Sequence, residues 1–259
     1  MTAILRSEGL HKRFGAVSAA TDVNLSVEEG EIVALIGANG AGKTSYVNMV
    51  TGYLRPDAGR IRLGETDLVG MKPRQVTRAG ICRSFQVAQI FGELTVLENV
   101  LIALAIARGG ASSGWRGLSR PEWISASEEV LEQFQLAEHR DATAGTLAQG
   151  VRKLLDIAMA TVASPRLMML DEPTSGISVD EKFAVMDTLM SALRQRGVTV
   201  LFVEHDMEIV ERYARRVAAF YDGRIIADGD AAEVLVDPDV RQYVVGGELH
   251  RRGGQGGGE

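Results

Sequence analysis

Cysteine, long apolar runs and surplus positive charge are all scarce in this sequence. Cys82 is its single cysteine, which excludes an internal disulfide and indicates a small buried hydrophobe more than a metal ligand. The formal net charge is -6, so we expect no nucleic-acid partner, because neutralising phosphates takes a surplus of Lys and Arg on one face. The longest purely apolar run, from Val100 to Ala107, is far shorter than the ~20 residues of a membrane-spanning helix.

The two ends of the sequence are informative for what they lack. Met1 to Arg6 lacks the basic, apolar and cleavage regions of a signal peptide, so we expect the chain to stay in the cytoplasm. Residues 250–259 are dominated by glycine and are expected to be disordered, because they have nothing to bury. Overall, 46% of the 259 residues are hydrophobic and 24% are charged, which is typical of a globular protein with a sizeable core.

A glycine-rich stretch from Gly37 to Ser45 has the spacing G-x-x-x-x-G-K-T. The apolar run 32–36 precedes it and a helical pattern follows it, which predicts a strand, a loop and a helix. Such a loop turns its backbone N–H groups toward a phosphate, and the helix adds the positive end of its dipole. Lys43 would reach the β and γ phosphates, and the Thr44 hydroxyl would ligate Mg²⁺. The alternative is a glycine-rich turn without a ligand. The expected nucleotide contacts are Asn39, Gly40, Ala41, Gly42, Lys43, Thr44 and Ser45.

Three further predicted strands end in residues capable of chemistry. Asp171 and Glu172 follow the apolar run 167–170, which suits a Mg²⁺ site on Asp171 and an attacking water polarised by Glu172. Gln86 and His205 end two other strands, and the carboxyl ends of parallel strands share one edge of a sheet. Taken singly, each of these residues has an alternative without a ligand. Asp171 and Glu172 would form an acidic turn at the end of a strand, Gln86 would lie at the surface, and His205 would form a hydrogen bond with a neighbour.

With these motifs in place, the chain resembles the ATP-binding subunit of ABC transporters over about residues 4 to 246. Gly37 to Ser45 resembles the Walker A motif, and the strand ending at Asp171 resembles Walker B, with Glu172 as the catalytic glutamate. Gln86 resembles the Q-loop glutamine, a further Mg²⁺ ligand, and His205 the switch histidine. Phe14 resembles the aromatic residue that stacks on adenine; a core phenylalanine is the alternative.

The family's L-S-G-G-Q signature is matched imperfectly by Leu147, Ala148, Gln149, Gly150 and Val151. Ala148 stands where the usual serine donates to the γ-phosphate held by the opposite subunit, and Val151 replaces the usual glutamine. Gly150 remains before a predicted helix, whose N-terminal amides still suit a phosphate. Ser178 likewise stands where an aspartate is common. These departures weaken the expectation of a symmetric, fully active homodimer.

Finer features resemble one branch of the family, the Liv-type ATPases of branched-chain amino acid importers. They are Arg83 to Gln86, an insertion at 109–123, the L-A-x-G form of the signature, Val203 to Met207, and Asp237 to Val240.

The branch implies an ATPase that uses ATP and Mg²⁺ and works with a second, identical or related ATPase subunit. It also implies two membrane permease subunits and, indirectly, an extracytoplasmic solute-binding protein. Its place would be the cytoplasmic face of the inner membrane, peripheral through the permeases. Ile90 and Phe91 are the predicted permease contact, with two core residues as the alternative.

Three other functions stay open at this point. They are a soluble ABC-type ATPase without a transport role, an importer ATPase for urea or small carboxylates, and a small-molecule kinase. A DNA-acting relative would need a long coiled-coil insertion, and a translation-type relative would carry two cassettes.

The fold that the resemblance implies is α/β: a P-loop, RecA-like core with an antiparallel β subdomain and an inserted α-helical subdomain. We expect one nucleotide-binding domain over 1–249, with the core at 1–86 and 164–249 and the helical subdomain at 87–163. The residue pattern predicts strands within 3–30 and at 60–63, 80–86, 166–170 and 198–203, a strand pair around Asp222, and helices at 43–50, 96–107, 128–134, 151–162, 180–194 and 231–236. Trp115 and Trp123 would pack a loop at 109–115.

Overall fold

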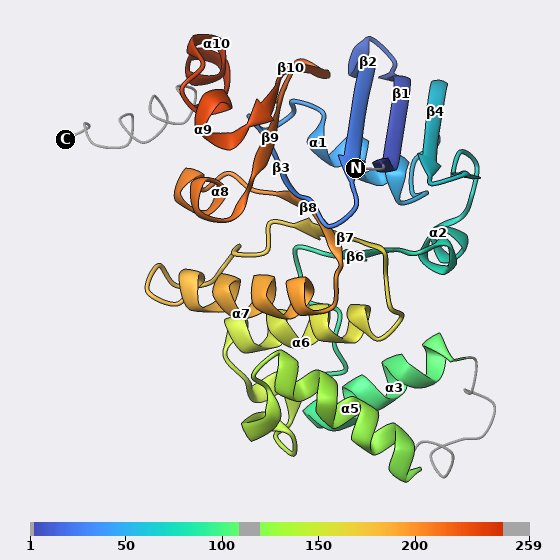
Figure 1. Ribbon diagram of the computed structural model, residues 1–259, viewed down its shortest axis with the longest axis vertical. Coiled ribbons are helices and arrows are strands. Elements are labelled where there is room, and N and C mark those ends of the chain that lie inside the picture. The colour runs from blue at the N-terminus through green and yellow to red at the C-terminus, as the bar shows by residue number, and fades with distance from the viewer. Residues whose placement is uncertain (1–2, 109–119, 246–259) are drawn as a thin grey trace. The chain divides into compact units, whose positions relative to one another are not determined.

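The computed structural model describes residues 3–108 and 120–245, and it is mixed α/β (Figure 1). Its chain divides into two compact units. Among the described residues, the first comprises 3–79 and 199–245, and the second comprises 80–108 and 120–198.

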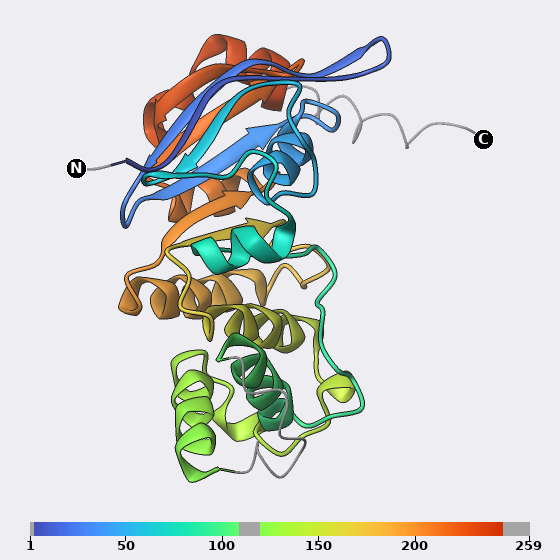
Figure 2. The ribbon, with the colours of Figure 1, turned by 90° about the vertical axis from the view of Figure 1, so that its right-hand side faces the viewer.

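The first unit contains an antiparallel sheet built around a long hairpin (Figure 2). Its strands are β1 (Ala3–Phe14), β2 (Val17–Glu28), β4 (Ala58–Leu63) and β5 (Thr66–Asp67), in the order β2-β1-β4-β5. Buried apolar residues alternate with exposed ones along β2, where Val23, Leu25 and Val27 point inward. This alternation is the pattern of a sheet with one covered face, and it confirms the antiparallel strands predicted for residues 3–30.

The same unit contains a second group of strands, which is mainly parallel. β3 (Ile32–Gly37) pairs in parallel with β8 (Thr199–Val203) and with β9 (Arg216–Tyr221), and β10 (Arg224–Asp230) is antiparallel to β9. Every residue from Ile32 to Ile36 is buried, because a parallel strand is covered on both faces. The helical segments of this unit are α1 (Lys43–Val50), α2 (Pro73–Ala79), α8 (Met207–Tyr213), α9 (Ala231–Val234), α10 (Pro238–Val240) and η4 (Arg241–Val245).

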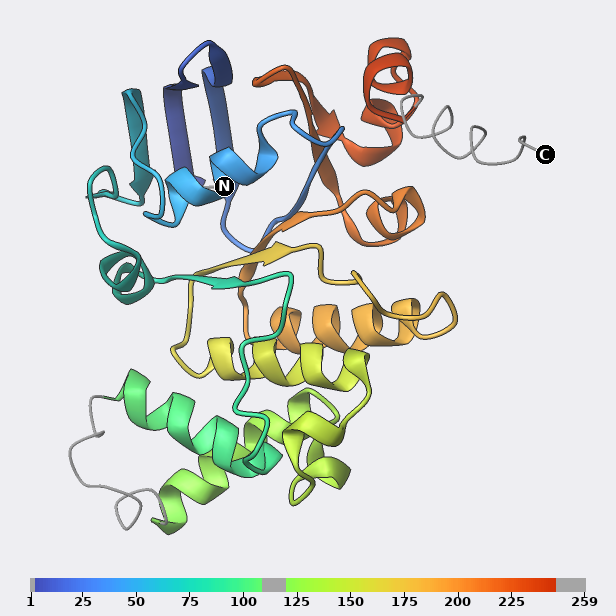
Figure 3. The ribbon, with the colours of Figure 1, turned by 180° about the vertical axis from the view of Figure 1, so that it is seen from behind.

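The second unit combines two parallel strands with a group of helices. β6 (Ile81–Ser84) pairs in parallel with β7 (Leu167–Asp171). The helices are α3 (Val96–Ala107), α5 (Pro121–Gln133), α6 (Gln149–Thr161) and α7 (Lys182–Gln195), with 3-10 turns at Ala137–His139 and Ala144–Thr146. α6 lies beside α7 and also contacts α3 and β6 (Figure 3).

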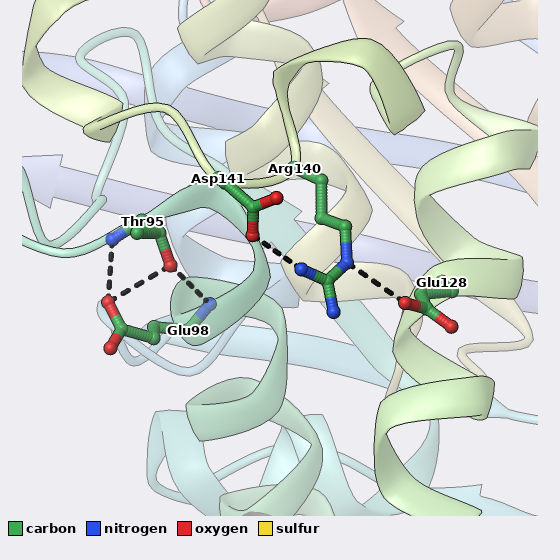
Figure 4. Close-up of polar contacts among 5 residues, drawn as sticks. All are labelled: Thr95, Glu98, Glu128, Arg140 and Asp141. Carbon is green, nitrogen blue, oxygen red and sulfur yellow. Dashed lines mark hydrogen bonds and ion pairs between the residues drawn. The ribbon is translucent and has the colours of Figure 1, made fainter. Parts of the chain in front are cut away.

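Side-chain hydrogen bonds fix the start of α3 in this unit (Figure 4). The Thr95 hydroxyl accepts from the Glu98 N–H at 3.2 Å, and the Glu98 carboxylate accepts from the Thr95 N–H at 2.8 Å. This capping box satisfies two N–H groups that a helix start leaves open, and such a cap contributes about 1 kcal/mol. Nearby, Arg140 bridges Glu128 of α5 and Asp141.

Several predicted boundaries need correction. β6 ends at Ser84 and does not reach Gln86, so the glutamine lies on a loop. The helix predicted from residue 128 begins at Pro121, because proline suits the first turn, where no N–H partner is required. The helices α2 and α8 were not predicted. Trp123 is buried on α5, whereas Trp115 and the tail 250–259 lie outside the described residues. Within the described ranges, no helix is both long and apolar enough to cross a membrane.

Candidate functional site

The glycine-rich loop of the first unit joins β3 to α1 and depends on glycine at two close approaches. Gly37, at φ 154°, would place a Cβ atom 2.5 Å from the carbonyl oxygen of Phe220. Gly42, at φ 108°, would place one 2.5 Å from the carbonyl oxygen of Ala19. A side chain at either position would collide with backbone, and Gly42 also has a left-handed backbone that disfavours other residues. The predicted strand, loop and helix are confirmed.

Lys43 begins α1 and turns its side chain back into the loop. Its Nζ atom donates to the carbonyl oxygens of Gly37 at 2.5 Å and of Ala38 at 3.2 Å. The side chain is buried, so the loop itself supplies oxygen partners for the ammonium group. Asn39, Gly40 and Thr44 are exposed, Ser45 is half-buried and Ala41 is buried.

Phe14 ends β1 and is 52% exposed, so the alternative that it belongs to the core is wrong. The Nζ atom of Lys12 lies 5.6 Å from the centre of the Phe14 ring, and it also pairs with Asp57 at 2.7 Å. An exposed ring at the end of a strand is available for stacking on a flat ligand.

The end of β8 brings His205 to the same edge as the glycine-rich loop. Leu35 of β3 lies beside Val203 of β8, and the two strands are parallel, so both continue from one edge of the sheet. Glu204 is fully buried, and the His205 Nδ1 atom lies 3.9 Å from its carboxylate. The imidazole itself is 54% exposed. Asp206 has a structural task, since its carboxylate accepts from the Glu208 N–H and caps α8.

In the second unit, Asp171 forms an ion pair that sequence reasoning did not find. An Nη atom of Arg83 lies 2.6 Å from Asp171 Oδ2, and the two side chains are 9% and 15% exposed. Arg83 lies beside Met169 in the β6–β7 register, two residues before the acid. A basic residue directly after the apolar pair Ile81 and Cys82 of a short strand was the signal available in the sequence, because a nearly buried charge requires a partner.

Glu172 and Gln86 are brought together at the adjacent strand ends. The Gln86 Nε2 atom donates to Glu172 at 2.9 Å and lies 3.5 Å from the Ser175 hydroxyl. Glu172 has a φ of 47°, a left-handed backbone that costs energy for a residue with a side chain. Strain of this kind gathers at sites where a side chain must point in a fixed direction.

The signature-like stretch forms the start of α6. Ala148 is the N-cap residue, and its methyl group offers the helix no hydrogen bond. Gly150 packs so closely that a Cβ atom there would lie 2.8 Å from a methyl group of Val185. The Gln149 amide donates to the carbonyl oxygen of Ser175 at 3.2 Å, while Leu147 is half-buried.

The loop after β6 and the start of α6 border one pocket of about 510 Å³. It is lined by Gln86, Val87, Ala88, Ile90, Gln149, Arg152, Lys153 and Ser175. Phe91, next to this lining, is 48% exposed, so the alternative that both Ile90 and Phe91 are core residues is wrong for Phe91.

Comparison with known proteins adds a family and named relatives. A family model described as "ABC transporter" matches residues 20–175. The high-affinity branched-chain amino acid transport ATP-binding protein LivG of Salmonella typhimurium is 37% identical over 94% of this chain and 98% of its own length. BraF of Pseudomonas aeruginosa, which carries the same description, is 35% identical over 94% of this chain and 98% of its own.

Solved structures give the same result for the fold. An ATP-binding cassette of an ABC transporter in its ADP conformation has a TM-score of 0.82 at 31% identity, covering 95% of this chain and 100% of its own. A nucleotide-free cassette from an ABC transporter has a TM-score of 0.81, also at 31% identity, covering 93% of this chain and 98% of its own.

Proposed function

The chain belongs to the ABC transporter family, as an ATP-binding cassette with a P-loop fold, and it is an ATPase. From this premise we propose that it energises the import of branched-chain or other hydrophobic amino acids. The observation that supports this cargo is the 35–37% identity to LivG and BraF over nearly the whole chain. Their descriptions name branched-chain amino acid transport and do not name urea, carboxylates or a role outside transport.

For nucleotide binding, we propose that the loop 37–45 encloses the phosphates of ATP. Lys43 would exchange its carbonyl partners on Gly37 and Ala38 for phosphate oxygens, which bear more negative charge. The exposed ring of Phe14 would stack on the adenine. Support comes from Gly37 and Gly42 of this loop, where a side chain would collide with the backbone of Phe220 and of Ala19, because glycine lets a backbone curl around a phosphate.

For Mg²⁺, we propose Thr44, Gln86 and Asp171 as ligands. All three offer oxygen, the donor that this hard cation prefers. Gln86 uses its Nε2 atom on Glu172, which directs the other end of the amide, a carbonyl oxygen, elsewhere. Arg83 contacts one oxygen of Asp171 and holds the carboxylate in one orientation. A bound Mg²⁺ would neutralise charge on the transferred phosphoryl group.

For hydrolysis, we propose Glu172 as the residue that polarises the attacking water and His205 as a contact of the γ-phosphate. The bond from Gln86 and the left-handed backbone together restrict where the Glu172 carboxylate can point. A positioned carboxylate of this kind contributes about 10²–10⁴ in rate as a general base.

Glu172→Gln tests this assignment, because it removes the charge while an amide oxygen can still accept from Gln86. We expect ATP affinity within about twofold of wild type and turnover lowered about 100-fold or more. Glu138→Gln is the matched control, since the Glu138 side chain is 81% exposed, and it should turn over normally. Hydrolysis at the wild-type rate by Glu172→Gln would show that Glu172 does not polarise the attacking water.

For the ATPase partner, we propose that Leu147, Ala148, Gln149 and Gly150 face the nucleotide of a second ATPase subunit. Light scattering of Glu172→Gln with Mg-ATP tests whether that subunit is an identical chain. A nucleotide-dependent dimer would mean that the amides at the start of α6 suffice without the usual serine hydroxyl. A monomer that holds ATP would indicate a related chain as partner.

For transport, we propose that two permease subunits hold the chain at the cytoplasmic face of the membrane, with Ile90 and Phe91 at the contact. Purification of the tagged chain from native membranes should yield both permeases, and Phe91→Asp should lower that yield. Vesicles carrying the complex and its solute-binding protein should accumulate labelled leucine only when ATP is enclosed. Uptake of urea but not leucine would refute the cargo.

A further inference from the structure

The loop that follows β6 is held at its backbone by two charged side chains of α6. The Nζ atom of Lys153 donates to the carbonyl oxygens of Phe85 at 2.5 Å and of Gln86 at 3.3 Å. One carboxylate oxygen of Asp156 accepts from the N–H of Gln89 at 2.9 Å. The backbone is thus fastened on both sides of the Gln86 side chain.

Both charged groups are buried, which is unusual on the packed face of a helix. Lys153 is 3% exposed and Asp156 is 8% exposed. Residues three apart share one helix face, so the two face the same loop. Burial raises the pKa of the Asp156 carboxyl, while the Gln89 N–H and the charge of Lys153 oppose that rise. Apolar side chains would pack this face at a lower desolvation cost, so packing alone does not account for the two charges.

Other bonds fix the remainder of this loop. On α3, Asn99 accepts from the Phe91 N–H at 2.8 Å and donates to the Phe91 carbonyl oxygen at 3.0 Å. The side chain of Gln86 is left to contact Glu172, as described above. Because α6 starts with the signature-like stretch and carries Lys153 one turn later, a displacement of that helix start would move the loop backbone at Gln86.

We propose that Lys153 and Asp156 are positioning residues for ATP hydrolysis, which act by fixing the backbone of the Gln86 loop to α6. The kinetic part of this proposal rests on the proposed function. The mechanical part, that the two side chains hold residues 85–89 in place, does not require catalysis and is tested separately.

Amide hydrogen exchange on the whole chain without nucleotide tests the mechanical part. In Asp156→Ala the Gln89 amide should exchange at least about tenfold faster, because it loses its acceptor, while Asp156→Asn should stay near wild type. Lys153→Met should raise exchange across residues 85–89. Arg194→Met, an exposed charge loss on α7, is the control and should leave that segment unchanged. Unchanged exchange in both Asp156→Ala and Lys153→Met would overturn the proposal.

A double-mutant cycle tests the kinetic part. Lys153→Met should lower kcat about tenfold with the KM for ATP within about twofold, since a slight misplacement of a positioned group has effects of this size. In a Gln86→Ala background the same change should lower kcat less than about twofold, because the two act through one group. Lys153→Arg, which can still donate to both carbonyl oxygens, should retain most activity.

The outcomes separate the possible failures. Equal losses of kcat in both backgrounds would overturn the proposal in favour of a general structural role of Lys153. If Lys153→Met or Asp156→Ala unfolds, Lys153→Leu and Asp156→Leu remove the same donor and the same acceptor and provide the same comparison, with Lys153→Arg and Asp156→Asn as the conservative controls. A wild-type chain that binds but does not hydrolyse ATP, alone or with its partners, would instead refute the proposed function, while exchange at Gln89 would still decide whether α6 holds the loop.

Discussion

Removing the guanidinium group of Arg83 should destabilise the protein strongly, and the structure allows the size to be worked out. The Arg83–Asp171 pair has an N···O distance of 2.6 Å, with side chains 9% and 15% exposed. Truncating one partner of such a pair leaves a nearly buried charge without compensation, at about 3–5 kcal/mol. The guanidinium carbon of Arg83 also lies 5.0 Å from the centre of the Phe85 ring. Such a cation–π contact contributes about 0.5–1 kcal/mol at an exposed site. We therefore expect Arg83→Met to cost about 4 kcal/mol.

Thermal unfolding by calorimetry, with EDTA and no nucleotide, measures this cost. For a chain of this size about 1 kcal/mol corresponds to roughly 2–4 °C, so Tm should fall by about 8–16 °C. Arg83→Met combined with Asp171→Leu removes both charges and should recover most of the loss, because no buried charge remains. Arg194→Met should stay within about 2 °C of wild type. An unchanged Tm for Arg83→Met, or a double variant less stable than the single one, would refute the reasoning.

Three further predictions concern single side chains. Phe14→Ala should weaken ATP binding about tenfold in titration calorimetry, since base stacking on an aromatic ring is worth about 1–3 kcal/mol, with Tm unchanged because the ring is exposed. Ala148→Ser should raise Tm by about 2–4 °C in the thermal assay, because a serine N-cap adds about 1 kcal/mol to α6. Burial raises the pKa of Cys82 to about 11, so a thiol reagent at pH 8 should label this thiol slowly in the folded protein and rapidly in guanidinium. Because the folded state disfavours the thiolate, the free energy of unfolding should fall as the pH rises through that pKa.

The strongly patterned parts of the fold were predictable from the sequence. α3 begins and ends at the predicted residues, because apolar residues recur at helical spacing and Thr95 caps its start. β7 and β8 followed from short apolar runs that end in acids. α2 and α8 were missed because each is a short helix of seven residues with few buried side chains, so neither shows a clear period.

The site shows the same division between local pattern and tertiary contact. The glycine-rich loop was predictable because its requirements are local: a tight curl, close backbone approaches and a helix start. The roles of Arg83, Lys153 and Asp156 were not, because each depends on a partner brought near by the fold. In sequence, a buried Lys on an amphipathic helix looks the same as a solvated one. Only the distances to Asp171, Phe85 and Gln89 distinguish them.

The structure explains how α6 can start without the serine that is usual in the family signature. The start of α6 is fixed by its surroundings and not by a capping side chain, since Gly150 packs against Val185 and Gln149 bonds to Ser175. A helix start without an intramolecular cap retains open N–H groups, and an anion can satisfy them. Replacing the usual serine with Ala148 therefore removes one donor and leaves these amides available to a phosphate. If the proposed contact with a partner's nucleotide forms, the loss of the hydroxyl should therefore weaken it without abolishing it.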